Sequence, residues 1–199
     1  MADMALHYPP LQVGAGRRLG VGWWGVLGLI ATEGALFIYL LFGYAYSALQ
    51  NDPSWMPEQP ALRLSLPNTA LLLLSSVAVW WGERANRKGE RRQVSLGVGI
   101  ALLLGIAFVA IQLLEWHNKS FSLRSGLYGS LFYTITGFHM AHVVVGIGSL
   151  AALLCWSLLG YLGPVRNAPL LAVAAYWHFV DAVWLAVFST LYLSPLLLG

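Results

Sequence analysis

Charged side chains are scarce in this sequence: Asp, Glu, Lys and Arg make up 10% of its 199 residues. A soluble domain of ordinary composition has about 25%. The sequence is also 58% hydrophobic, and its mean hydropathy is +0.68. This composition excludes a soluble globular domain and indicates a protein that crosses the membrane several times.

Cysteine is almost absent, and several catalytic signatures are missing. The single cysteine, Cys155, lies inside an apolar run, so neither an intrachain disulfide nor a thiol metal site is expected. The sequence has no glycine-rich phosphate loop, no nucleophile elbow and no pair of inverted repeats of the transporter kind. The net charge of +3 comes largely from short basic clusters beside apolar runs, which indicates membrane topology and no nucleic-acid partner.

Five apolar runs are long enough to cross a bilayer, whose hydrocarbon core of about 30 Å needs about 20 helical residues. The first run exceeds the apolar part of a signal peptide, so we expect an uncleaved signal anchor. Pro67 is expected in the first turn of the second span. The sequence therefore predicts an all-α fold, a polytopic transmembrane bundle of five helices in a single membrane domain (1–199). The expected spans are about 22–48, 66–82, 94–115, 127–158 and 170–194.

The distribution of basic residues predicts the orientation of these helices. Cytoplasmic loops carry an excess of Lys and Arg. With the N terminus inside, eight basic residues lie inside and three lie outside. The sequence therefore predicts an inside N terminus and an outside C terminus. The inside set is Arg17, Arg18, Arg84, Arg87, Lys88, Arg91, Arg92 and Arg166, and the outside set is Arg63, Lys119 and Arg124.

Ionisable residues stand near the middle of three spans. Glu33 lies in the first, His139 and His142 in the fourth, and His178 and Asp181 in the fifth. A residue three positions on shares the same side of a helix, so each of the two later pairs shares a face. An acid at the centre of a membrane helix costs about 2.5 to 3.5 kcal/mol, which makes such a residue a candidate for function. We expect these five residues to form one central polar layer.

Each member of this layer has a structural and a functional interpretation. Glu33 is either a carboxylic acid bonded to another helix or a residue for proton uptake. His178 and Asp181 are expected to share a local hydrogen bond across one helical turn. Two histidines do not complete a metal site, so none is predicted. Composition and spacing leave open a free-standing proton or solute carrier and a purely structural scaffold.

At these residues the sequence resembles a known family, subunit III of the haem-copper terminal oxidases. Residues 176–193, YWHFVDAVWLAVFSTLYL, are similar to the C-terminal signature of that family. The YGS, TGFH and HV pattern of the family recurs at residues 128–130, 136–139 and 142–143. The start of the first span and Glu33 resemble the helix that carries the family's buried, carbodiimide-reactive acid. The resemblance runs in order from about residue 23 to 194.

The resemblance implies the five-helix bacterial form of the family, a multi-pass protein of the cytoplasmic (inner) membrane. Such a subunit binds no haem or copper itself, packs directly against the catalytic subunit I, holds structural phospholipid in a cleft and supports sustained proton uptake. Haem and copper would lie in subunit I, and subunit II with small subunits would complete the complex. The complex would reduce oxygen to water and pump protons, with either cytochrome c or a quinol as electron donor.

The resemblance also assigns expected roles to individual residues. No residue of this chain is expected to be catalytic, and Glu33 would be the buried acid near the lipid cleft. The remaining members of the polar layer would shape the helix bundle: His139, His142, His178 and Asp181. The candidates for contact with lipid or another subunit are Trp23, Trp24, Glu115, Trp177 and Trp184. The nearest alternative is a subunit III-like accessory protein of a nitric oxide reductase.

Overall fold

The structure, a computed structural model, describes residues 21–51, 55–58, 62–164 and 167–198, and the expectations for Arg17, Arg18 and Arg166 lie outside these residues. All regular secondary structure in the described ranges is helical, which confirms the predicted fold class. Five helices are long and apolar enough to cross a membrane. The helices are α1 (Val21–Gln50), α2 (Leu62–Arg87), α3 (Arg91–His117), α4 (Leu127–Leu158) and α5 (Ala168–Phe188), followed by the π-helical turn η2 (Ser189–Leu193) and α6 (Ser194–Leu198).

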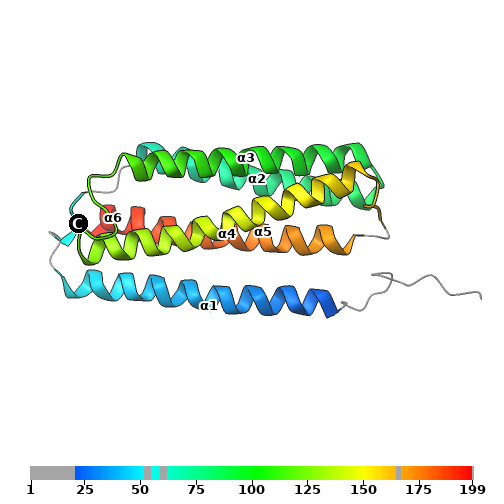
Figure 1. Cartoon of the computed structure of the whole chain (residues 1–199). Coiled ribbons are helices and arrows are strands. Elements are labelled where there is room, and N and C mark those ends of the chain that lie inside the picture. The colour runs from blue at the N-terminus through cyan, green and yellow to red at the C-terminus, as the bar shows by residue number, and fades with distance from the viewer. Residues whose placement is uncertain (1–20, 52–54, 59–61, 165–166, 199) are drawn as a thin grey trace, which may run out of the picture.

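Helices α2 to α5 pack together, and α1 lies on one side along α4 and α5 (Figure 1). In the most apolar stretch of α1, 6% of the residues are buried, against 28–44% in the other four spans. The α2 and α3 helices approach closely, because a Cβ at Gly97 would stand 2.7 Å from the carbonyl oxygen of Ala78. α1 is therefore the peripheral helix of a bundle that is otherwise tightly packed.

The centre of the bundle is packed around Trp177, whose side chain is fully buried. A Cβ at Gly105 on α3 would stand 2.8 Å from the indole ring, and one at Gly146 on α4 would stand 2.7 Å from it. The indole N–H donates a hydrogen bond to Ser75 Oγ on α2 at 2.8 Å. Trp177 thus joins α5 to three neighbouring helices, with its ring in a slot that only glycine leaves open.

Helix α2 differs from the span expected for it. It begins at Leu62, so Pro67 lies inside the helix and not in its first turn. Proline has no N–H to donate to the carbonyl four residues earlier, and membrane helices tolerate this loss where neighbouring groups compensate. At its other end α2 continues through Arg84 and Arg87, because positive charge in a last turn complements the helix dipole.

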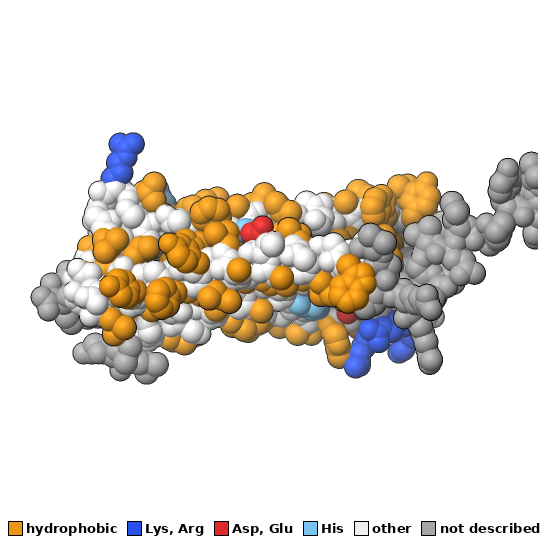
Figure 2. All heavy atoms as spheres, turned by 90° about the horizontal axis from the view of Figure 1, so that it is seen from below, with side chains coloured by type: hydrophobic (Ala, Val, Ile, Leu, Met, Phe, Trp, Pro, Cys, Tyr) orange, Lys and Arg blue, Asp and Glu red, His pale blue; other side chains and the backbone are white. Residues whose placement is uncertain are grey.

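Apolar side chains cover the middle of the molecule, and Lys and Arg side chains gather at its two ends (Figure 2). This distribution matches a bilayer, in which charged groups reach the headgroups and apolar groups face the acyl chains. An acidic side chain is visible in the middle of the face shown in Figure 2. The same membrane-spanning zone therefore contains polar groups that apolar packing alone does not explain.

Candidate functional site

Glu33 on α1 meets His142 on α4 inside the membrane-spanning zone. The carboxylate Oε2 and the imidazole Nε2 are 3.0 Å apart. The Glu33 side chain is 29% exposed and the His142 side chain 15%, so the pair lies at the edge of the bundle. Phe37 covers the imidazole from one side, with the ring centroids 5.2 Å apart. This contact joins the peripheral helix α1 to the bundle.

The second nitrogen of His142 determines how many protons this pair holds. Nδ1 lies 2.7 Å from the carbonyl oxygen of Phe138, and a carbonyl can only accept, so Nδ1 carries a proton. The contact between Nε2 and Glu33 then needs one further proton, on either the carboxyl or the imidazole. The pair is therefore either a neutral acid with a neutral imidazole or a carboxylate with an imidazolium, and these two states differ in the position of one proton.

A groove of about 250 Å³ opens beside this pair between α1, α4 and α5. Its walls are apolar apart from the ionisable pair and the Tyr176 side chain, whose hydroxyl donates to the carbonyl oxygen of His142 at 3.2 Å. The groove therefore lies where the peripheral helix α1 meets the rest of the bundle. The lining residues are Leu29, Glu33, Ala141, His142, Val145 and Tyr176.

The other ionisable pair meets through Ser76 of α2, which sequence reasoning did not assign to a site. Ser76 Oγ donates to the Asp181 carboxylate and lies 2.8 Å from His178 Nδ1. With its hydrogen directed to Asp181, the hydroxyl oxygen accepts from the Nδ1–H of His178. The expected local bond between His178 and Asp181 is thus replaced by a bridge to another helix, which joins α5 to α2.

His139 lies apart from both pairs. Its side chain is 1% exposed, and within the described part of the chain neither ring nitrogen has a hydrogen-bond partner. Aromatic rings of three helices surround it, with the centroids of Phe37, Phe108 and Trp184 between 4.9 and 6.3 Å away. The structure therefore divides the expected central layer into two hydrogen-bonded pairs and one imidazole enclosed by aromatic rings.

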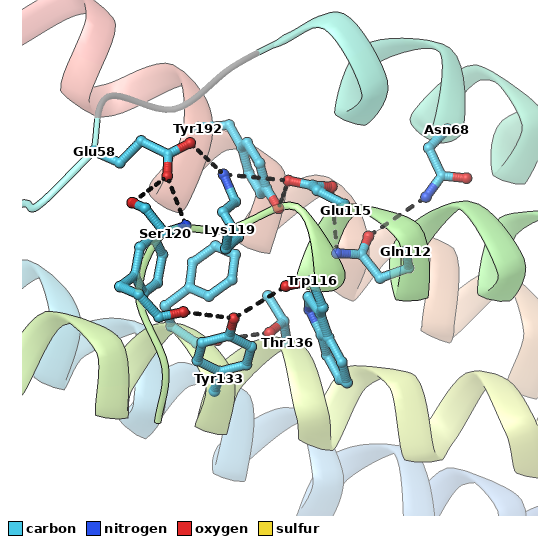
Figure 3. A network of polar contacts seen from close by, with 12 residues as sticks. Glu58, Asn68, Gln112, Glu115, Trp116, Lys119, Ser120, Tyr133, Thr136 and Tyr192 are labelled. Atoms are coloured by element: carbon cyan, nitrogen blue, oxygen red, sulfur yellow. Dashed lines mark hydrogen bonds and ion pairs between the residues drawn. The ribbon is translucent and has the colours of Figure 1, made fainter. Parts of the chain in front are cut away.

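A further polar network surrounds Lys119, which lies just after the C-terminal end of α3 (Figure 3). The Lys119 ammonium lies 3.8 Å from a carboxylate oxygen of Glu58 and 3.8 Å from one of Glu115, and its side chain is 6% exposed. Tyr192, in the η2 turn, donates its hydroxyl to Glu115 at 2.8 Å. Gln112 donates to the second Glu115 oxygen at 3.4 Å. The network joins the α1–α2 connection to the end of α3 and to η2.

Glu58 belongs to the connection between α1 and α2, outside the spans. It accepts hydrogen bonds from the backbone N–H and the hydroxyl of Ser120, at 3.2 and 2.8 Å. Partial burial acts to raise the pKa of Glu58, but the two Ser120 hydrogen bonds and the positive charge of Lys119 outweigh it and lower that pKa. The carboxylate is therefore held ionised, and it fixes this connection against the segment after α3.

The aromatic and acidic candidates for lipid or subunit contact divide into two groups. Trp24 is 63% exposed and Trp23 is partly exposed, so both reach the surface of α1. Glu115 is 4% exposed and lies within the Lys119 network. Trp177 and Trp184 are 0% and 1% exposed, and their indole N–H groups bond to Ser75 and Thr69. In a correction to the expectation, these three residues hold the chain together and do not face lipid or a partner.

Two parts of the site have a recognisable signal in the sequence. Glu115 and Lys119 are four residues apart, the spacing at which opposite charges meet on one helix face. Ser76 had a weaker signal, a hydroxyl within an apolar run. The contacts of Glu58 and Tyr192 had none, because they depend on the path of a connection and on the extra residue in a π-helical turn.

Comparisons with known proteins agree with this architecture. The family model described as cytochrome c oxidase subunit III matches residues 13–195. Cytochrome c oxidase subunit 3 of Danio rerio and that of Gallus gallus are each 33% identical to this chain over 194 residues, and that of Cyprinus carpio is 32% identical. Each match covers 94% of this chain and 72% of the relative. With five membrane-spanning helices and a match over most of its length, this chain belongs to the cytochrome c oxidase subunit III family.

Proposed function

We propose that this chain is the non-catalytic subunit III of a bacterial haem-copper terminal oxidase, which reduces oxygen to water and pumps protons. In this proposal it stabilises subunit I, holds phospholipid and supports proton uptake. The observation that carries the proposal is the Glu33–His142 pair, a carboxyl and an imidazole whose Oε2 and Nε2 atoms lie 3.0 Å apart inside the membrane-spanning zone. Ionisable side chains within membrane-spanning segments are typical of proton pathways.

The groove beside the pair supports the lipid part of the proposal. Its volume of about 250 Å³ and its largely apolar walls suit an acyl chain. The exposed apolar face of α1 suits either lipid or a helix of subunit I, and it includes Ile38, Tyr39, Phe42 and Leu49, which are 65–85% exposed. Subunit II and small subunits would contact the assembled complex elsewhere.

In this proposal the redox groups of the enzyme lie in subunit I, as the family resemblance implies. No three His, Cys, Asp or Glu side chains in these ranges form a group that could hold a metal ion. His139 has free ring nitrogens, but aromatic rings surround it where a haem or a second ligand would have to stand. In this proposal the polar side chains described above orient one another and hold a proton. We assign no electron-transfer step to them.

The location and orientation are also part of the proposal. The bacterial cytoplasmic membrane follows from the family resemblance alone, and the relatives named above come from Danio rerio and Gallus gallus. The basic residues of the α2–α3 turn support an inside position for that turn. An outside position for the Lys119 network follows, because α3 joins the two.

Purification through a tag on this chain, followed by mass spectrometry and a reduced-minus-oxidised spectrum, tests the assignment. We expect a large partner subunit with an a-type or o-type haem band. A b/c-type spectrum without copper would instead indicate the nitric oxide reductase relative. A colourless protein without partners would overturn the proposal and favour a carrier.

Replacement of the buried acid tests the proton role. In the assembled complex we expect Glu33→Gln to keep a hydrogen bond to His142 but to remove the ionisable carboxyl, so that oxygen consumption declines several-fold sooner during sustained turnover. The matched control is Thr32→Val, because the Thr32 hydroxyl bonds only to carbonyls of its own helix. Normal sustained turnover in Glu33→Gln, with altered assembly, would support a purely structural role.

A further inference from the structure

One exposed side of α2 changes from apolar to basic at one end of the helix. Leu73, Val77, Trp80, Arg84 and Arg87 follow one another at intervals of three and four residues, so they form one stripe along the helix. All five side chains are exposed, with Val77 at 57% and Trp80 at 46%. The stripe thus presents an apolar surface followed directly by two guanidinium groups.

Trp80 and Arg84 are arranged as a unit at this transition. The Arg84 guanidinium carbon lies 3.8 Å from the centroid of the Trp80 ring, a cation–π contact. Tryptophan is enriched at the depth of the headgroups, where one part of the ring is apolar and the other is wet. The stacked ring therefore holds Arg84 at a position where its N–H groups can meet a lipid headgroup.

The surroundings of the two arginines are strongly positive. Residues 83–92 contain five basic and two acidic residues, and the five basic side chains are all exposed. Guanidinium groups bind phosphate through paired N–H donors. Basic clusters next to a membrane span attract anionic lipid headgroups.

From the continuity of this stripe we propose that α2 binds an anionic phospholipid, with its phosphate at Arg84 and Arg87 and its acyl chain along Leu73, Val77 and Trp80. This site is separate from the groove at Glu33, which lies between α1, α4 and α5. The occupant is a membrane lipid and not a soluble anion, because the apolar part of the stripe continues directly from the basic part. An acidic protein surface would need no such acyl-chain path.

Photocrosslinking in the assembled complex tests the site. The complex is placed in nanodiscs of phosphatidylcholine and phosphatidylglycerol, with a diazirine in the acyl chain of one lipid at a time, and crosslinked peptides are identified by mass spectrometry. We expect the phosphatidylglycerol probe to label α2 around Leu73 and Val77 far more than the phosphatidylcholine probe does. At roughly five-fold per basic side chain, Arg84→Gln with Arg87→Gln should reduce the labelling at least five-fold.

Matched variants separate this site from a general effect of charge. Arg63→Gln with Arg124→Gln removes two exposed basic side chains from the other end of the molecule and should leave the labelling unchanged. Arg84→Lys with Arg87→Lys keeps the charge and should retain at least half of the labelling. An equal loss in the Arg63 and Arg124 variant, or a lysine variant as weak as the glutamine variant, would overturn the proposal.

Two further outcomes would also contradict it. If the glutamine variant loses a partner subunit from the purified complex, the stripe is a protein interface. Equal labelling of α2 by the two lipid probes would show that the site does not distinguish their headgroups.

Discussion

Ser76 is the residue whose removal most directly tests the contact between α2 and α5. Its hydroxyl bonds to both His178 and Asp181, so Ser76→Ala leaves both groups without their shared partner. Leaving a buried polar group unsatisfied costs about 1–3 kcal/mol. We expect the free energy of unfolding of the chain to fall by about that amount, measured by denaturant unfolding in detergent.

Ser149 on α4 provides the matched control for this prediction. Within the described ranges its hydroxyl donates to one group, the Val145 carbonyl of its own helix, at 2.9 Å. We expect Ser149→Ala to change the free energy of unfolding by less than about 0.5 kcal/mol. Equal effects of the two alanine variants would mean that the Ser76 bridge contributes nothing.

At the scale of helices, close packing against Trp177 can be tested with a pair of glycines on α4. A Cβ at Gly146 would stand 2.7 Å from the indole ring, whereas a Cβ at Gly148 would meet nothing within 4 Å. Overfilling a packed core costs about 1–3 kcal/mol. We expect Gly146→Ala to lower the free energy of unfolding by that amount and Gly148→Ala to leave it unchanged or raise it slightly.

A second substitution checks that the indole ring is the cause. Trp177→Phe shortens the ring, so adding Gly146→Ala to it should cost less than adding Gly146→Ala to the wild type. Residues in direct contact show such non-additive effects. Additive effects of the two substitutions would show that the cost of Gly146→Ala does not come from contact with the Trp177 ring.

The connection between α1 and α2 has its own pH dependence, because Glu58 is outside the spans. Its pKa in the folded chain lies below the usual value of 4.5. The ionised Glu58 carboxylate therefore stabilises the folded chain fully at pH values above 4.5. This stabilisation is lost as the pH falls through the lower pKa of the folded chain. We expect the difference in unfolding midpoint between wild type and Glu58→Gln to shrink as the pH falls below about 4.5.

The partner of this carboxylate supplies a graded comparison. Ser120→Ala removes the hydroxyl donor and leaves the backbone N–H in place, so it should show a smaller version of the same pH-dependent difference. A difference between wild type and Glu58→Gln that grows as the pH falls would contradict the direction of the pKa shift.

Sequence patterns predict some levels of this structure better than others. Apolar runs locate the five helices, because each must span the same bilayer thickness. The helix ends are less well predicted: Arg84 and Arg87 remain helical beyond the apolar run, and Pro67 is tolerated within α2. Hydropathy reports where lipid surrounds the chain, and it carries no information on where a helix continues into the headgroups.

The polar residues show the same division between position and partner. Depth along each helix indicates that Glu33, His142 and Asp181 lie within the membrane, but not which helix faces them. Glu33 pairs across the bundle with His142, and Asp181 pairs with Ser76 of α2. His139, at a similar depth, has no such partner in the described ranges. Contacts between helices depend on rotation and packing, which a single sequence leaves open.

For the whole molecule, the structure sharpens the charge asymmetry on which the orientation rests. The α2–α3 turn carries exposed Arg87, Lys88 and Arg91 at one end. At the other end Lys119 is buried between the Glu58 and Glu115 carboxylates, so its charge is locally balanced. Lys119 therefore adds little free positive charge at its end of the molecule.

This asymmetry predicts which end of the molecule an impermeant reagent can reach. Cys155 is the only cysteine, so Cys155→Ser gives a background without thiols. In that background we expect Asn118→Cys to react with a membrane-impermeant maleimide in intact cells, because Asn118 is exposed beside the Lys119 network. Lys88→Cys should react only after the membrane is permeabilised, because positive charge is retained on the cytoplasmic side. The opposite labelling pattern would reverse the orientation and place the basic end of α2 on the outer face of the membrane.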